Sequence, residues 1–209
     1  MIRPIMPRIT PEITENPLIL VNGIVLLVLT VLTAVFISLY ASNVYKGNKK
    51  KAALFFTVIA VLSALSLFCF FGCAATTVKG IIFCLLLAFS SYEDIKTREC
   101  ENYVHLMIVI AAFIGTDMSA LPGMLLSALI ISGIMLMTAA VTKSSIGGAD
   151  IKLSAACAFM LGTVQGMTGL MIGLILAVII NSIKNRKKKN EGFPLIPYLA
   201  VGFMTAYFM

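Results

Sequence analysis

Long apolar runs separated by short charged loops constrain the fold of this chain more than any other feature. Residues 18–41 and 52–73 contain no charged side chain. A helix of about 20 apolar residues is long enough to cross the hydrocarbon core of a bilayer. Only 12% of the residues are charged, about half the share of an ordinary soluble domain, and the mean hydropathy is +1.02. The sequence therefore predicts an all-α polytopic membrane protein.

The spacing of the apolar runs predicts about eight transmembrane helices. They are expected at residues 18–41, 52–73, 79–94, 102–115, 122–141, 150–162, 166–183 and 194–209. The chain divides into three parts: a polar segment (1–17), two helices joined by a basic loop (18–78), and a core of about six helices (79–209). No soluble domain and no internal repeat is evident.

The basic residues indicate how the helices are oriented. If the loop at residues 46–51 is cytoplasmic, alternation of the spans leaves only Arg3, Arg8 and Lys79 of the 16 basic residues on the other side. Lys and Arg concentrate in cytoplasmic loops, so both termini are expected to be extracytoplasmic. The net charge of +7 is then a topology signal, and the expected partners of the basic loops are anionic lipids rather than nucleic acid.

Two aspartates lie at the ends of predicted helices. Asp94 ends the third helix and Asp150 begins the sixth, so alternation puts both at the cytoplasmic edge of the membrane. Carboxylates near lipid are costly and usually functional. Two that meet titrate as a unit, and one can take a proton from water while the other donates one, as in aspartic proteases. Gly147 and Gly148 are expected to let the backbone turn sharply or approach a substrate. The helix dipole should favour ionised Asp150 and protonated Asp94.

Other interpretations of these acids remain open. Each aspartate could be a solvated boundary residue or a helix N-cap. A cation- or proton-coupled transporter could use the same pair, although transporters usually place such acids near the midplane between inverted repeats. Glu93, Glu99 and Glu101 either form a negative cluster beside Asp94 or pair with basic residues of their own loop. His105 either packs between helices or hydrogen-bonds one aspartate.

The cysteines predict neither a disulfide framework nor a zinc site. Four of the five lie in apolar stretches, and Cys69 and Cys73 have helical spacing. Buried cysteine usually behaves as a small apolar side chain. We expect no metal and no cofactor.

Three separated segments carry motifs. Residues 94–102 read Asp-Ile-Lys-Thr-Arg-Glu-Cys-Glu-Asn, residues 147–153 read Gly-Gly-Ala-Asp-Ile-Lys-Leu, and residues 193–202 read Phe-Pro-Leu-Ile-Pro-Tyr-Leu-Ala-Val-Gly. In order and spacing they resemble the motifs of type IV prepilin peptidases, membrane aspartic proteases of the GxGD type. Those motifs are an aspartate segment ending Ile-Pro-Asn or Ile-Pro-Asp, then Gly-x-Gly-Asp-x-Lys-Leu, then Pro-x-x-Pro-[Phe/Tyr]-Leu-Ala-x-Gly. The resemblance covers roughly residues 80–209.

The resemblance implies removal of a short basic leader from prepilin-like substrates at the cytoplasmic face of the cell membrane. It maps the two catalytic aspartates onto Asp94 and Asp150. The supporting motif residues are Asn102, Gly147, Gly148, Lys152, Pro194 and Pro197. The candidate leader-binding residues are Glu93, Glu99 and Glu101, the only acidic cluster beside Asp94. A GxGD intramembrane protease with other substrates and a catalytically silent scaffold for pilus assembly are the alternatives.

The chain departs from the family pattern in three places. Cys100-Glu101 replaces Ile-Pro, so a looser loop is expected after Asp94, and Ala149 replaces the second motif glycine. Long members of the family carry a four-cysteine zinc domain after the first helix, but here only residues 42–51 occupy that place. The chain thus resembles a short form. Long members also N-methylate the new N-terminus of the pilin. The sequence does not decide whether this short form has that activity, and it does not decide the oligomeric state.

Overall fold

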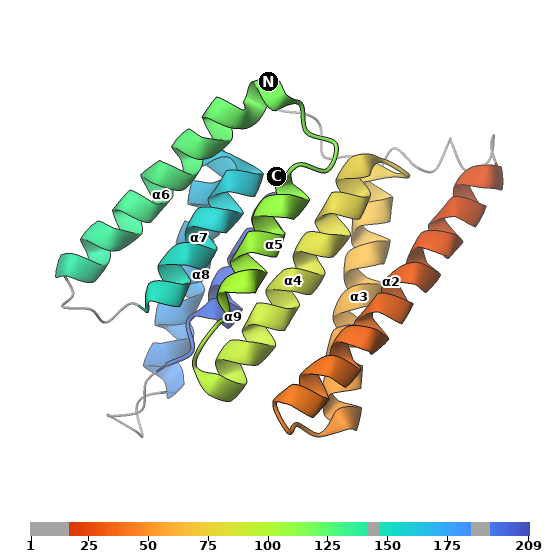
Figure 1. Cartoon of the computed structure of the whole chain (residues 1–209), viewed down its shortest axis with the longest axis horizontal. Helices are drawn as coiled ribbons and strands as arrows, with labels where there is room; N and C mark the ends of the chain where they lie inside the picture. The colour runs from red at the N-terminus through yellow and green to blue at the C-terminus, as the bar shows by residue number, and fades with distance from the viewer. Residues whose placement is uncertain (1–16, 142–146, 185–192) are drawn as a thin grey trace. The chain divides into compact units, whose positions relative to one another are not determined.

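The computed structural model describes residues 17–141, 147–184 and 193–209, and these residues are helical except for short connections (Figure 1). The α-helices are α2 (Pro17–Val44), α3 (Lys49–Phe71), α4 (Ala75–Thr97), α5 (Asn102–Ala112), α6 (Leu121–Val141), α7 (Gly148–Leu161), α8 (Thr163–Lys184) and α9 (Ile196–Tyr207). A 3-10 turn, η1 (Met118–Ala120), precedes α6. The predicted all-α architecture is confirmed for the described residues.

Helices α3, α4 and α8 begin three or four residues earlier than the sequence pattern predicts, and α3 starts at Lys49 rather than at Ala52. α4 starts at Ala75 rather than near Lys79, and α8 starts at Thr163 rather than at Gly166. In both cases a glycine with positive φ, Gly72 (+66°) or Gly162 (+86°), ends the preceding helix. Glycine adopts this left-handed conformation without steric cost, so the next helix starts almost at once.

In the part of the chain that the structure describes, five helices are long and apolar enough to cross a membrane: α2, α3, α4, α8, and α6 together with η1. The helices α5 and α9 are apolar but shorter, and α7 has 14 residues. Large apolar side chains project outward from the long helices; Phe36 on α2, for example, is 70% exposed. These features support a multi-pass membrane protein. The number of eight spans and the side on which the termini lie stay predictions.

The structure falls into two compact units whose boundary lies inside α4. Among the described residues, unit 1 comprises those from 17 to 85 with Phe208, and unit 2 comprises those from 86 to 207 with Met209. In unit 1, α2 packs against α3 so closely that a Cβ at Gly23 would lie 2.7 Å from the Phe68 ring. Asn48 caps α3, so Lys49, Lys50 and Lys51 of the predicted basic loop form the first turn of that helix. The predicted division after residue 78 stays a prediction.

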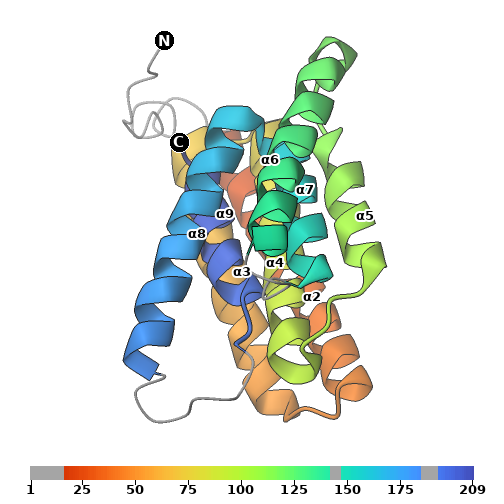
Figure 2. The same ribbon diagram turned by 90° about the vertical axis from the view of Figure 1, so that its left-hand side faces the viewer.

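In unit 2, the short helix α7 packs against α5, α6, α8 and α9 (Figures 1 and 2). Small side chains allow these neighbours to approach: Ala156, Cys157 and Ala158 are all buried. Thr163 at the start of α8 hydrogen-bonds Ser127 of α6 through their hydroxyl groups, at 2.8 Å. In the first turn of α7 the Asp150 side chain is buried, although Gly148 and Lys152 beside it are exposed.

Helices α8 and α9 contact each other through glycines. A Cβ at Gly202 of α9 would overlap the carbonyl oxygen of Gly169 and lie 2.8 Å from the Cα of Gly173, both on α8. Small residues let helix backbones approach closely in membrane proteins. Gly202 therefore fixes the position of α9, whose first residues reach the candidate site described below.

We expect Gly202→Ala to lower the free energy of unfolding by about 1–3 kcal/mol, because the added methyl group overlaps backbone atoms that cannot move independently. Gly133→Ala in α6 is the matched control, since a Cβ there meets no atom within 4 Å. The control should be neutral or slightly stabilising, because alanine favours a helix. Thermal unfolding midpoints in detergent measure both variants, and equal midpoints would contradict close packing of α8 on α9.

Candidate functional site: two buried aspartates

Asp94 lies in the last turn of α4 and is 7% exposed. Its Oδ2 atom accepts a hydrogen bond of 3.1 Å from the backbone N–H of Ile196, the first residue of α9. The first N–H groups of a helix have no partner within that helix. Pro197, the next residue, has no N–H, so Ile196 supplies the donor. Asp94 thus caps α9 from another helix.

Asp150 is held by its own helix. It lies in the first turn of α7, and its Oδ2 accepts the backbone N–H of the N-cap residue, Gly147, at 3.1 Å, which is one half of a capping box. Gly147 has φ −69° and ψ 147°, and neither it nor Gly148 has a positive φ. Neither glycine therefore adopts the left-handed conformation that other residues avoid, and the expectation of a sharp turn or a close approach to substrate stays a prediction. Gly147 leaves room for the carboxylate, because a Cβ there would lie 3.1 Å from Asp150 Oδ2.

The two carboxylates lie close enough for one to affect the other. Burial is the largest effect on Asp150, and together with the charge of Asp94 it raises the pKa of Asp150 to about 6, while the N–H of Gly147 acts in the opposite direction. Asp150 lies outside the five long helices and is 9% exposed. The helix dipole alone predicted a readily ionised Asp150, but loss of hydration outweighs that dipole. The pair can therefore share a proton near neutral pH.

The motif residues around the aspartates form a second contact. Lys152 Nζ of α7 donates a hydrogen bond of 2.9 Å to Oδ1 of Asn102, the first residue of α5. This bond connects the Gly-x-Gly-Asp segment with the end of the Asp94 segment. Pro194 precedes α9 and is half-buried, and the rings of Phe193 and Tyr198 stack around this entry at 4.8 Å. All three sequence motifs therefore meet at one end of unit 2.

The three glutamates of the predicted acidic cluster do not share one environment. Glu93 is 1% exposed and accepts the backbone N–H of Glu101 at 3.5 Å, whereas the side chains of Glu99 and Glu101 are exposed. The Cys100 thiol is close to Glu93, Asp94 and Asp150, and burial is the main reason why its pKa is raised above the usual value. Within the described ranges, no three His, Cys, Asp or Glu side chains are arranged to hold a metal ion.

Two buried polar side chains close to this site have no hydrogen-bond partner among the described residues. They are His105 on α5, at both ring nitrogens, and Ser154 on α7, one turn beyond Asp150. An unpaired polar group in a protein interior costs about 1–3 kcal/mol. Of the two expectations for His105, the hydrogen bond to an aspartate is not observed, whereas its burial on α5 agrees with packing between helices.

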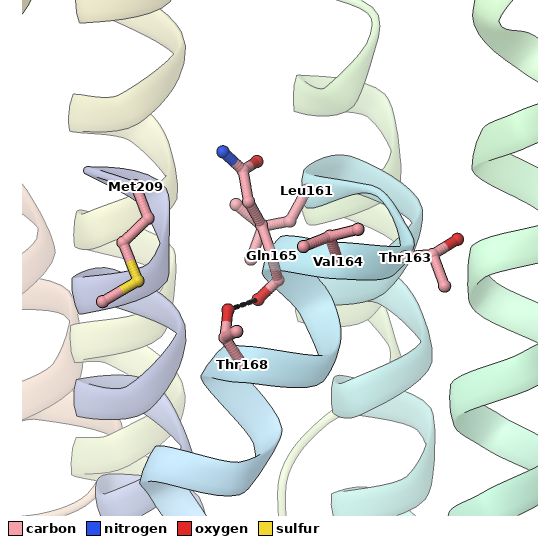
Figure 3. Close-up of a pocket in the computed structure, with 6 residues that line it drawn as sticks. All are labelled: Leu161, Thr163, Val164, Gln165, Thr168 and Met209. Atoms are coloured by element: carbon pink, nitrogen blue, oxygen red, sulfur yellow. Dashed lines mark hydrogen bonds between the residues drawn. The ribbon is translucent and has the colours of Figure 1, made fainter. Parts of the chain in front are cut away.

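A hollow of about 530 Å³ opens at the other end of α7 (Figure 3). It is lined by Leu161, Thr163, Val164, Gln165, Thr168 and Met209, and the hydroxyl of Thr168 donates to the backbone carbonyl of Gln165 at 2.9 Å. None of these side chains is ionisable. Because α7 runs from Asp150 at one end to Leu161 at the other, the hollow is separate from the two aspartates.

We predict that the protonated fraction of Asp150 falls as the pH rises through about 6. Dicyclohexylcarbodiimide, which reacts with protonated buried carboxyl groups, should label Asp150 at pH 5 and much less at pH 8. In Asp94→Asn the midpoint should move to lower pH, because one cause of the raised pKa is gone. Asp117→Asn is the control, since Asp117 is exposed and makes no cap hydrogen bond. A midpoint unchanged by Asp94→Asn would show that the carboxylates do not interact.

Comparison with known proteins agrees with this geometry. The sequence profile of the type IV leader peptidase family matches residues 81–182, a segment that contains Asp94, Asn102, Gly147, Asp150 and Lys152. Searches of curated proteins and of solved structures gave no significant match. The family match, together with the convergence of the motif segments on two buried aspartates, supports the assignment of the chain to the type IV leader peptidase family.

Proposed function

We propose that this leader peptidase-like protease is an aspartic endopeptidase that removes the short basic leader of type IV prepilin-like proteins. The observation that supports the proposal most is the electrostatic coupling of Asp150 to Asp94 in a buried site. A pair of carboxylates that share a proton can act as base and acid at once. That chemistry requires no metal and no side-chain nucleophile.

The hydrogen bonds of the pair leave one oxygen of each carboxylate for catalysis. Both backbone donors bind Oδ2, and among the described residues no donor hydrogen-bonds Oδ1 of Asp94 or of Asp150. These two atoms are available to a water molecule and to the scissile carbonyl group. The ionised carboxylate removes a proton from water as the water oxygen attacks the carbonyl carbon. The protonated carboxylate donates its proton to the carbonyl oxygen, and the leaving amine is protonated when the carbon–nitrogen bond breaks.

The raised pKa of Asp150 suits this mechanism. A general acid or base is most effective when its pKa lies near the working pH, and a value of about 6 keeps both protonation states populated near neutrality. An exposed aspartate with an ordinary pKa would be almost entirely ionised there. Burial of Asp150 in the first turn of α7 supplies the difference.

Glu99 and Glu101 are the proposed binding residues for the basic leader. Both side chains are exposed and lie in the loop that follows Asp94. Glu93 differs from them because it is buried and bound to Glu101. The exposed pair can therefore attract Lys or Arg side chains of a leader while the scissile bond lies at the aspartates.

The proposed site faces the cytoplasm from the cell membrane. The distribution of Lys and Arg supports this orientation, because all but three of the 16 basic residues lie on the predicted cytoplasmic side. Lys49, Lys50 and Lys51 at the start of α3 are proposed to bind anionic lipid headgroups on that side.

The first test is cleavage of a co-expressed prepilin, followed as a mobility shift. We expect Asp94→Asn and Asp150→Asn each to lower the cleavage rate by about 10²–10⁴-fold, because each removes one proton-transferring group. Asp117→Asn is the matched control and should cleave normally. Membrane insertion of every variant is verified by fractionation.

Retention of activity by either aspartate variant would refute the proposed pair. A wild-type protein that inserts but cuts no prepilin would refute the prepilin substrate. Proton flux in proteoliposomes would then test the transporter alternative, and a panel of other membrane substrates would test the intramembrane protease alternative.

A second test concerns the leader. Glu99→Lys combined with Glu101→Lys should raise KM for a basic leader by about 3–10-fold with a smaller change in kcat, because exposed charges contribute modestly to binding. A prepilin whose leader carries glutamates in place of its basic residues should recover the lost affinity. Asp117→Lys controls for the change in net charge. Unchanged KM values for both leaders would contradict recognition by these glutamates.

A further inference from the structure

The chain reverses direction between the end of α4 and the start of α5, one turn after Asp94. Residues 98–101, which make this connection, are here named the return loop. Arg98 ends α4 with φ +61°, in the left-handed region that usually requires glycine, and its N–H donates to the carbonyl of Asp94 at 3.0 Å. The Thr97 hydroxyl accepts the N–H of Glu99 at 3.3 Å. A non-glycine residue in this conformation costs about 1–2 kcal/mol, so the surrounding contacts must maintain it.

The return loop lacks the proline that resemblance to the family predicts at position 101. Glu101 nevertheless has φ −66° and ψ 140°, and this φ is the angle at which a proline ring is fixed. The backbone thus has a proline-like conformation without a proline. Unlike proline, Glu101 has an N–H group, and this group donates to Oε2 of Glu93 at 3.5 Å.

Glu93 contacts two consecutive residues of the return loop. Besides donating the N–H of Glu101, the return loop places the Cys100 thiol near enough to the Glu93 carboxylate for its charge to act on the thiol. Burial and then the negative charge of Glu93 raise the pKa of that thiol, which therefore remains protonated near neutral pH. A carboxylate that is 1% exposed must be compensated by donors such as the N–H of Glu101.

We propose that Glu93 is a positioning residue that holds the return loop in the conformation that proline would otherwise impose. The proposal rests on the proposed function of Asp94 and Asp150 as the catalytic pair. Glu93 is adjacent to Asp94 in the last turn of α4, and the loop that it binds leads directly to Asn102, the partner of Lys152 on α7. Glu93 therefore connects the segment of one aspartate to the helix of the other.

The same contacts separate Glu93 from the leader-binding glutamates. Because Glu93 is 1% exposed, a leader side chain reaches its carboxylate much less readily than the exposed carboxylates of Glu99 and Glu101. The structure thus assigns different effects to the acids of this segment. Loss of Glu93 should lower kcat through misplacement of the aspartates, whereas loss of an exposed glutamate should raise KM.

The experiment is a rescue by proline. Glu93→Ala should lower kcat for prepilin cleavage by about 10-fold or more, and Glu93→Gln should lower it less, because the amide oxygen still accepts the N–H of Glu101. Adding Glu101→Pro to Glu93→Ala should restore kcat, since proline fixes φ and needs no acceptor. Adding Glu101→Gln is the matched control: it removes the same charge but keeps the N–H, and it should restore nothing.

A second readout does not depend on cleavage. In a Cys69→Ser, Cys73→Ser background, which removes the two exposed thiols, maleimide labelling reports on Cys100, because Cys84 and Cys157 are buried. Labelling should be about 10-fold faster in Glu93→Ala, and Glu101→Pro should slow it again. Thermal unfolding midpoints establish that each variant is folded, and Glu93→Gln replaces Glu93→Ala if the latter is not.

Three outcomes would overturn the proposal. One is a Glu93→Ala variant that changes only KM and recovers with a charge-reversed leader, which would make Glu93 a leader-binding residue. Another is equal kcat for the proline and glutamine double variants. The third is maleimide labelling that is the same with and without Glu93. If the wild-type protein cleaves no prepilin, the proposed function fails, but the labelling experiment still decides whether Glu93 holds the return loop.

Discussion

The hydrogen bond from the Ile196 N–H to Asp94 is the interaction on which the arrangement of the site depends. It joins the C-terminal end of α4 to the N-terminal end of α9, two segments about a hundred residues apart in sequence. A helix N-terminus carries unpaired N–H groups and partial positive charge, so it is a natural partner for a carboxylate. The bond forms only if α9 is correctly placed. The close contact of Gly202 with Gly169 and Gly173 on α8 provides that placement.

The site is built from backbone donors and burial. Asp94 and Asp150 each accept one backbone N–H, and both side chains are nearly inaccessible to solvent. Arg98 is close enough for its charge to act on Asp94. The hydrogen bonds to Oδ2 of the two aspartates nevertheless come from the main chain. Main-chain donors fix the geometry of a carboxylate without the conformational freedom of a long basic side chain. Burial then makes the protonated form of Asp150 accessible near neutral pH.

Much of the architecture could be predicted from the sequence because it follows from local chemistry. The apolar runs predicted the helices, and the positions of Asp94 and Asp150 at helix ends were also evident. The sequence pattern predicts that α4 starts at a charged residue, Lys79, and α8 at a glycine, Gly166, whereas the positive φ of Gly72 and Gly162 makes both helices start earlier. The sequence pattern does not predict the bond between Ile196 and Asp94. A proline at the second position of α9 was its only signal in the sequence.

The sequence by itself determined the all-helical architecture and pointed to the family and to two candidate aspartates, because hydropathy and motif order are properties of the chain. Only the tertiary structure decided how the acids differ. Asp150 and Asp94 interact, Glu93 is buried, and Glu99 and Glu101 remain exposed, although all three glutamates lie within nine residues of sequence. Burial and electrostatic coupling depend on which helices pack together. That packing arises from contacts such as those of α7 with its neighbours, which no local pattern of the sequence encodes.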